Sequence, residues 1–348
     1  MKMAAVHRAL SGRLRQTVVH TGQHYDWAMS GIFFEQLGVP APDVNLEVGS
    51  ASHAVQTAEV MIRLEPLLLR ANPDLVIVYG DVNSTVATAL VCSKIGIPIA
   101  HVEAGLRSRD RTMPEEINRI VTDALADLLL TPSEDANANL AAEGVPDSRV
   151  HFVGNVMIDT LVRLLPSTDP DGLVKRLGLT RPFALVTLHR PSNVDDPATL
   201  GPLLEALIEI SATLDVVFPV HPRTRSRIVE FVATVPTALR VVDPLGYLDF
   251  LALQQRAAVV ITDSGGIQEE TTYLGVPCLT VRENTERPIT ITHGTNTLVG
   301  RDPARLRDET LRAVAMPRPV SSPPPLWDGR AGERIADILV AFEGEHRK

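Results

Sequence analysis

The sequence lacks the features of a disulfide-bonded or membrane-spanning protein. It contains only two cysteines, Cys92 and Cys278, each beside an apolar run, and we expect both to be buried, reduced thiols. No apolar run reaches the ~18 residues that a membrane span needs. The chain also shows no secretory signal peptide. These absences predict a cytoplasmic protein.

The basic excess typical of nucleic-acid binders is missing as well. The formal net charge at pH 7 is −9, from 33 Lys and Arg against 42 Asp and Glu, whereas nucleic-acid binders usually show a basic patch or stripe. An acidic protein can still hold a small phosphate group, so the charge argues against nucleic acid more than against nucleotides. No His, Asp or Glu pair has a tight helical ligand spacing such as H-E-x-x-H, so we expect no metal site.

Short apolar runs alternate with longer amphipathic stretches along the 348 residues. This alternation predicts an α/β protein with parallel sheets covered by helices. We expect strands at 17–20, 75–80, 97–103, 127–131, 150–154, 183–189, 215–221, 240–243, 258–263 and 277–281. We expect helices at 52–71, 82–95, 114–125, 133–143, 197–213, 264–274, 305–315 and 331–343.

Two breaks in this pattern predict two domains. The first break, at 165–182, separates an N-terminal domain of residues 1–165 from a C-terminal domain of residues 166–330. The second break is the Pro- and Ser-rich segment 316–329. We expect that segment to be extended, and the final stretch 331–348 to join the N-terminal domain.

Polar residues follow most of the predicted strands, at the edge where parallel sheets bind their ligands. Acids dominate in the first half, where Asp81 and Glu103 end two consecutive strands. In the second half, His189 and His221 end two strands, and a Gly-Gly turn follows a third. This asymmetry predicts one site shared by both domains, with an anion held by the second.

The stretch "TDSGGIQEE" is the clearest candidate for that anion. Glycines at a strand-to-helix turn let backbone N–H groups approach an anion at the positive end of the helix. Ser264 would cap this helix or bind the anion. Glu270 lies more than a turn into the helix, where a sugar diol suits a carboxylate better than a phosphate does. The alternative is a capped helix with acids in its first turn and no ligand.

Carboxylates near the first-half strand ends are candidates for proton transfer. Asp81 and Glu103 can act as acid and base if their environments separate their pKa values. The structural alternative is that Asp81 caps a helix and Glu103 pairs with Arg107. Glu115 of "MPEEINR" and Arg119 have the i, i+4 spacing of a helical ion pair, which alone would explain both.

The histidines at the strand ends have two readings. His189 and His221 would polarise a phosphate or shuttle a proton. A single strand-end histidine is more often structural, but two in equivalent places favour function.

Taken together and in order, "TGQHYD", "YGDVNST", "HVEAGLRSRDRTMPEEINR", "TLHRPSNVDD", "HPRTR", "DPLGYLDF", "TDSGGIQEE" and "TERP" resemble the non-hydrolysing UDP-N-acetylglucosamine 2-epimerases. The resemblance runs from about residue 2 to the last helix. It implies two Rossmann-like domains in a glycosyltransferase-B arrangement, with the active site in the interdomain cleft. It also implies a homodimer that interconverts UDP-GlcNAc and UDP-ManNAc with neither NAD nor metal.

The resemblance assigns roles to particular residues. The expected catalytic residues are Asp81, Glu103, Glu115 and His189. The expected substrate-binding residues are Ser264, Gly265 and Gly266 for the diphosphate, Glu270 for the ribose, Arg287 for the phosphates, Leu245 and Phe250 for the uracil, and Lys2 and His221. Gln23 and His24 would belong to a regulatory site for UDP-GlcNAc.

The chemistry implied by the resemblance explains why acids are needed. The C2 proton of an N-acetylhexosamine is not acidic, so it is removed as UDP leaves C1, which gives a 2-acetamidoglucal. Return of UDP with protonation from the other face inverts C2. A carboxylate takes the proton and a second acid delivers one. We favour Asp81 as the base, with Glu103 and Glu115 completing the set.

Two positions differ from the family pattern. The chain begins "MKMAAVHRAL", at a point that follows a strand and a phosphate-binding "G-T-R-P-E" turn in the family, although Lys2 is matched. Three explanations are open: a start assigned too far downstream, a shortened chain, or lost activity. In each case we expect the N-terminal sheet to lack the strand that precedes the "G-T-R-P-E" turn in the family. Ser192 stands where many members carry Glu.

Three other functions stay open. The first alternative is an enzyme that epimerises a modified sugar such as a UDP-diacetamido-uronic acid. The second is a hydrolysing epimerase that releases UDP and free ManNAc. The third alternative is a nucleotide-sugar binding protein without catalysis.

Overall fold

The structure is a computed structural model that describes residues 1–22, 38, 40–220, 224–225, 227–228, 236–318 and 322–346. The expected regulatory residues Gln23 and His24 lie outside the described residues, as does the expected substrate-binding residue His221.

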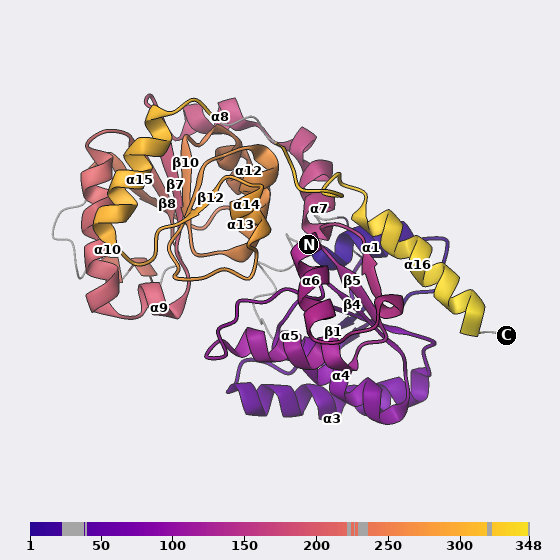
Figure 1. The fold of residues 1–348 in the computed structure, drawn as a ribbon. Helices are drawn as coiled ribbons and strands as arrows, with labels where there is room; N and C mark the ends of the chain where they lie inside the picture. Colours follow the sequence, from indigo (N-terminus) through magenta and orange to yellow (C-terminus); the bar gives the residue numbers. More distant parts are fainter. Residues whose placement is uncertain are drawn as a thin grey trace. The chain divides into compact units, whose positions relative to one another are not determined.

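The chain forms two compact units (Figure 1). Unit 1 comprises Met1–Thr160 and Pro325–Lys348, and unit 2 comprises Leu161–Pro324. Helix α7, Val156–Leu164, contains the point at which the chain passes from unit 1 into unit 2.

Unit 1 contains a four-stranded parallel sheet in the order β3-β4-β5-β6 and a separate parallel pair, β1-β2. Its strands are β1 Val19–His20, β2 Val44–Asn45, β3 Val76–Tyr79, β4 Ile99–Val102, β5 Leu128–Thr131 and β6 Val150–Phe152. Its helices are α1 Lys2–Leu10, α3 His53–Ala71, α4 Asn83–Ile95, α5 Pro114–Leu125, α6 Glu134–Ala142 and α16 Ala331–His346, with a 3-10 turn η1 at Asp147–Arg149.

Both faces of the unit 1 sheet are buried, which explains its nearly continuous apolar strands. One face packs against α1 and α16 through residues such as Val6, Leu10 and Ile335. The other face packs against α3, α4 and α6, with Leu64 and Cys92 among the buried residues.

Unit 2 contains a six-stranded parallel sheet in the order β12-β11-β10-β7-β8-β9. Its strands are β7 Phe183–Thr187, β8 Asp215–Pro219, β9 Leu239–Val242, β10 Val259–Thr262, β11 Cys278–Thr280 and β12 Asn296–Leu298. Its helices are α8 Pro170–Arg176, α9 Pro191–Val194, α10 Pro197–Ser211, α12 Tyr247–Arg256, α13 Gly265–Leu274, α14 Ile289–Thr292 and α15 Pro303–Ala315, with a 3-10 turn η2 at Leu165–Ser167.

Helices cover both faces of the unit 2 sheet as well (Figure 1). Helices α10 and α15 pack on one face through Leu203, Leu207 and Leu306. Helices α8, α12 and α13 cover the other face, where Leu173 and Leu253 are buried. The α/β class with parallel sheets is therefore confirmed.

Several helices begin and end as their sequences indicate. In both α10 and α15 an Asp-Pro pair starts the helix, and the aspartate side chain accepts a backbone N–H in the first turn. Helices α4 and α13 end at Gly96 and Gly275, which adopt the left-handed conformation that glycine tolerates.

Cys92 and Cys278 are buried free thiols, as expected. Burial raises the pKa of each thiol to about 12. Among the described residues, no helix is both long and apolar enough to cross a bilayer.

Candidate functional site

Asp81 and Glu103 follow neighbouring parallel strands of unit 1. Strands β3 and β4 pair in register with Tyr79 opposite Val102, so both carboxylate residues lie just beyond the same edge of the sheet. This is the edge at which open parallel sheets place ligands. The side chain of Asp81 is about a quarter exposed at 26%, whereas that of Glu103 is buried at 4%.

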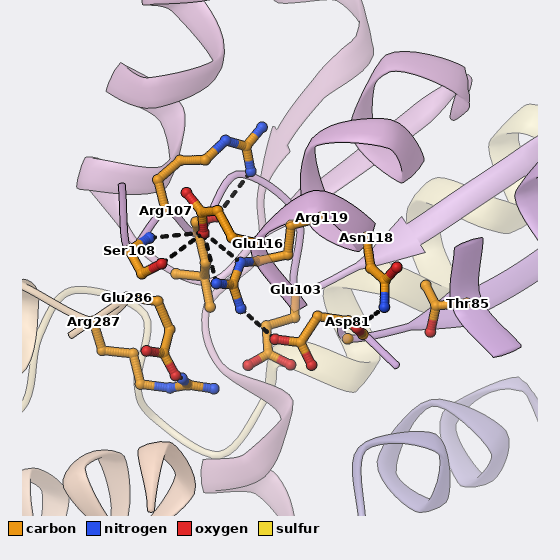
Figure 2. Close-up of polar contacts among 12 residues, drawn as sticks. Asp81, Thr85, Glu103, Arg107, Ser108, Glu116, Asn118, Arg119, Glu286 and Arg287 are labelled. Atoms are coloured by element: carbon orange, nitrogen blue, oxygen red, sulfur yellow. Dashed lines mark hydrogen bonds and ion pairs between the residues drawn. The ribbon is translucent and has the colours of Figure 1, made fainter. Parts of the chain in front are cut away.

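A buried arginine holds Asp81. Figure 2 shows the Arg119 guanidinium between the carboxylates of Asp81 and Glu116, with ion pairs to both. Arg119 is 2% exposed, so its charge is compensated by these carboxylates rather than by water. The Glu115–Arg119 pair considered from the spacing is wrong, because Arg119 pairs with Glu116 at i, i+3. Glu115 is half-buried in the first turn of α5.

Sequence reasoning missed Glu116, which organises the loop before α5. Its carboxylate accepts hydrogen bonds from the Ser108 N–H at 2.9 Å, the Ser108 hydroxyl at 3.0 Å and the Arg109 N–H at 2.9 Å. Burial alone would raise the pKa of Glu116, but these hydrogen bonds and Arg119 hold it below its ordinary value. Glu116 is therefore an anion that fixes Arg119.

Glu103 has an unusual backbone and a cationic partner. Its φ of 75° lies in the left-handed region, which is uncommon for residues other than glycine and often marks functional sites. Its carboxylate forms an ion pair with the Lys2 ammonium group. A Cβ atom at Gly80 would lie 2.7 Å from the Lys2 Nζ, so glycine leaves the space that the lysine needs.

The Glu103–Arg107 pair considered from the sequence is also wrong. Arg107 instead contacts Asp123 at 2.7 Å and Glu143 at 2.7 Å, away from the strand-end carboxylates. Glu103 is therefore paired with Lys2 rather than with the arginine nearest to it in sequence.

The glycine turn of unit 2 lies where the sequence indicates. Strand β10 leads into Ser264 at the N-cap position and then into Gly265, the first residue of α13. Ser264 thus occupies the N-cap position, but its side chain makes no capping hydrogen bond. The helix N-terminus thus presents backbone N–H groups and a hydroxyl at the end of a parallel strand.

Arg287 lies directly against this turn. A Cβ atom at Gly265 would collide with the Arg287 guanidinium and would lie 2.8 Å from the Glu286 Oε1. Arg287 forms ion pairs with Glu286 and, at 2.8 Å, with Glu269. The expected phosphate-binding arginine is thus beside the turn, with its charge balanced by two carboxylates.

Glu270 is buried on α13, with an exposed fraction of 1%. The Tyr247 hydroxyl donates a hydrogen bond of 2.8 Å to its Oε1. Burial raises the pKa of Glu270 to about 7, although the hydrogen bond from Tyr247 opposes that rise. Leu245 and Phe250 pack against the adjoining hydrophobic cluster as partly buried side chains.

His189 is held by an aspartate of the glycine turn. Its Nδ1 contacts the Asp263 Oδ1 at 2.8 Å, while its side chain stays 62% exposed. Asp263 also accepts hydrogen bonds from the backbone N–H of Arg190 at 2.9 Å and from the Asn193 amide at 3.0 Å. Burial would raise the pKa of Asp263, but His189, Arg190 and Asn193 hold it below its ordinary value. Asp263 therefore fixes the His189 ring and leaves its Nε2 toward solvent.

Comparison with known proteins gives consistent matches. The sequence model of the family described as UDP-N-acetylglucosamine 2-epimerase matches residues 8–340. The chain is 40% identical to the UDP-N-acetylglucosamine 2-epimerase of Methanocaldococcus jannaschii, over 98% of this chain and 95% of that protein. It is 41% identical to the UDP-2,3-diacetamido-2,3-dideoxy-D-glucuronate 2-epimerase of Pseudomonas aeruginosa, over 98% of this chain and 96% of that protein.

Similar solved structures are also known. The crystal structure of Methanocaldococcus jannaschii UDP-GlcNAc 2-epimerase in complex with UDP-GlcNAc and UDP has a TM-score of 0.88 and 39% identity, over 98% of this chain and 96% of that chain.

Proposed function

The chain belongs to the UDP-N-acetylglucosamine 2-epimerase family, and from this premise we propose that it interconverts UDP-GlcNAc and UDP-ManNAc by inverting C2. The observation that carries the proposal is the pair Asp81 and Glu103, at the ends of the adjacent strands β3 and β4. Each has a cation beside it, Arg119 on Asp81 and Lys2 on Glu103.

The proposed reaction is an elimination followed by an addition. Asp81 takes the proton from C2 while the C1–O bond to UDP breaks, which gives a 2-acetamidoglucal and free UDP in the site. The UDP oxygen then adds back to C1, and an acid delivers a proton to the opposite face of C2. Glu103 and Glu115 are the proposed partners of Asp81 in these proton transfers.

Arg119 and Lys2 would hold the carboxylates of Asp81 and Glu103 in place through their ion pairs. In this proposal Glu116 anchors the arginine and takes no proton, because hydrogen bonds already engage its carboxylate.

Unit 2 would hold the nucleotide. The N–H groups of Gly265 and Gly266 at the start of α13, with the Ser264 hydroxyl, suit a diphosphate, since a helix N-terminus favours anions. Arg287 beside the turn would donate hydrogen bonds to the diphosphate, in competition with its carboxylate partners Glu286 and Glu269. The buried Glu270 suits ribose hydroxyls.

Further ligand contacts would come from three other residues. Leu245 and Phe250 suit the uracil. The outward Nε2 of His189 suits a phosphate oxygen or a proton in transit.

We further propose that the protein is a homodimer that pairs through α3. Val55, Ile62 and Leu69 repeat every seven residues on this helix and are 52%, 65% and 62% exposed. Such a stripe of large apolar side chains is costly to leave in water, and a second copy of the same helix would cover it.

The second candidate substrate is a UDP-diacetamido-uronic acid. The observation in its favour is the 41% identity to the Pseudomonas aeruginosa enzyme that acts on such a sugar. We rank it second because the retained "TERP" motif with Arg287 favours the plain sugar, whereas a uronate would call for altered charge near it.

The test is to incubate the purified protein with each of the two nucleotide sugars side by side and to follow the sugars by proton NMR. We expect UDP-ManNAc to form from UDP-GlcNAc, and the Asp81→Asn variant to form none. Turnover of the uronate alone would select the second candidate. Free UDP that accumulates in step with ManNAc would indicate a hydrolysing enzyme instead.

A further inference from the structure

The backbone of residues 79–81, which ends in Asp81, is held in an unusual way. Three successive carbonyl groups each accept a hydrogen bond from a side chain, and the three donors come from three different elements. The contacts are Thr85 Oγ1 of α4 to the Tyr79 oxygen at 2.9 Å, His101 Nε2 of β4 to the Gly80 oxygen at 2.8 Å, and Asn118 Nδ2 of α5 to the Asp81 oxygen at 2.9 Å. We call Thr85, His101 and Asn118 the carbonyl clamp.

All three members of the carbonyl clamp are withdrawn from water. Thr85 is 3% exposed, His101 is fully buried and Asn118 is 9% exposed. Figure 2 shows Asn118 donating to the residue 81 backbone, with Thr85 nearby. Buried polar groups keep such bonds, because a lost partner leaves an unsatisfied group that costs more than the bond itself contributes.

The His101 ring has a single orientation that satisfies its neighbours. A carbonyl oxygen only accepts, so the hydrogen bond to Gly80 requires a hydrogen on Nε2. The other nitrogen, Nδ1, lies 2.6 Å from the Asp123 Oδ1. Asp123 in turn accepts from the Gly105 N–H at 3.0 Å and contacts Arg107 at 2.7 Å. The ring is therefore fixed from both sides.

The carbonyl clamp ties Asp81 to the other groups of the site. Its His101 lies on β4 and precedes Glu103, just beyond the end of that strand, by two residues. Its Asn118 precedes Arg119, which forms the ion pair with the Asp81 carboxylate. Backbone and side chain of residue 81 are thus both held by α5, and a shift of the strand end would displace the carboxylate from its partner.

We propose that Thr85, His101 and Asn118 are positioning residues for Asp81, acting through the backbone rather than on the substrate. The proposal rests on the proposed function, since it assumes that Asp81 transfers a proton. It gives a role to three buried polar residues of "YGDVNST", "HVE" and "EEINR". Errors of about 1 Å in the placement of a reacting group cost about a hundredfold in rate.

Thr85 offers a matched test within one helix. Thr88 lies one turn further along α4, is also buried, and donates to the Ser84 carbonyl at 2.7 Å, a bond inside the helix. Thr85→Val and Thr88→Val remove the same hydroxyl without changing the shape of the side chain. Thr85→Ser keeps the hydroxyl.

The measurements are kcat and KM for UDP-GlcNAc, the Kd for UDP, and the midpoint of thermal unfolding. We expect Thr85→Val to lower kcat by about tenfold to a hundredfold. We expect KM and the UDP Kd to stay within about twofold, since misplacing a reacting group affects the chemical step rather than substrate binding. Thr85→Ser should restore most of the rate, and Thr88→Val should match the wild type in kcat.

Equal kcat values for Thr85→Val and Thr88→Val would overturn the proposal, because the two variants differ only in which carbonyl loses its donor. If Thr85→Val fails to fold, Asn118→Ala decides, with the same expected fall in kcat and an unchanged UDP Kd. A wild-type rate from Asn118→Ala would likewise overturn it. Failure of the proposed function is distinguishable, because then the wild-type protein itself would convert no UDP-GlcNAc.

Discussion

Replacing Glu270 with glutamine should change how the stability of the protein depends on pH. Glu270 is buried on α13, and its pKa rises from an ordinary 4.5 to about 7. Glutamine has nearly the same shape and does not titrate. The Glu270→Gln variant therefore removes the proton equilibrium and keeps the packing.

The sign and size follow from proton linkage. Below pH 4.5 the carboxyl is protonated in both the folded and the unfolded chain, so its full stability contribution is present. Between pH 4.5 and about 7 only the unfolded chain loses the proton, so the wild type loses about 1.4 kcal/mol of unfolding free energy per pH unit. The whole loss is roughly 3 kcal/mol, and about 2 kcal/mol of it falls above pH 5.5.

The assay is equilibrium urea unfolding followed by circular dichroism, at several pH values from 5.5 to 8. The unfolding free energy of Glu270→Gln minus that of the wild type should increase by about 2 kcal/mol across this range. A companion variant, Tyr247→Phe, removes a hydrogen bond that lowers the pKa of Glu270. In Tyr247→Phe the pKa of Glu270 should be higher still, so the fall in unfolding free energy should continue to a higher pH than in the wild type. A difference between Glu270→Gln and the wild type that stays constant with pH would refute this reasoning.

Two further substitutions test nucleotide binding by the glycine turn of unit 2 and the proposed dimer. Gly265→Ala should weaken UDP binding by at least about tenfold in isothermal titration, because the new methyl group collides with Arg287. Gly344→Ala, where the methyl group meets open space, should bind UDP normally, and equal affinities for the two variants would contradict the prediction. Ile62→Glu should convert the dimer to a monomer in light scattering, because it places a charge in the apolar stripe of α3. Leu311→Glu, on an exposed position of α15, should leave the dimer intact, and a dimeric Ile62→Glu would contradict α3 as the interface.

The strands could be predicted because their residues carry the information themselves. A run such as residues 128–130 is apolar throughout because both faces of the sheet are covered, and this pattern can be recognised in the sequence. Strand β12, Asn296–Leu298, escaped prediction because it is three residues long and starts with asparagine. Helix α12 escaped because "DPLGYLDF" reads as a strand-end loop, although Gly246 is in fact the N-cap of a helix that carries Phe250.

The partners of the site residues could not be predicted in the same way. Glu115 and Glu116 are adjacent, and they precede Arg119 by four and three residues. Both spacings are compatible with an ion pair on a helix, so the sequence does not distinguish them. Glu116 is the residue that pairs with Arg119, and its carboxylate is held by hydrogen bonds from the N–H and hydroxyl of Ser108, in the loop before the helix. Long-range contacts of this kind leave no local signal.

Backbone acceptors are harder still to foresee. The carbonyl clamp on residues 79–81 uses acceptors that every residue possesses, so nothing in the sequence marks those three carbonyls. The donors Thr85, His101 and Asn118 are visible, but only the fold brings them to one strand end.

The most direct test of the account is to incubate the protein with UDP-GlcNAc in D2O and follow the hydrogen at C2 by NMR. The elimination–addition reaction predicts deuterium at C2 of UDP-ManNAc as it forms, and none from Asp81→Asn. Conversion that retains the original hydrogen at C2 would contradict proton removal by Asp81. Absence of both conversion and exchange would contradict the epimerase function itself.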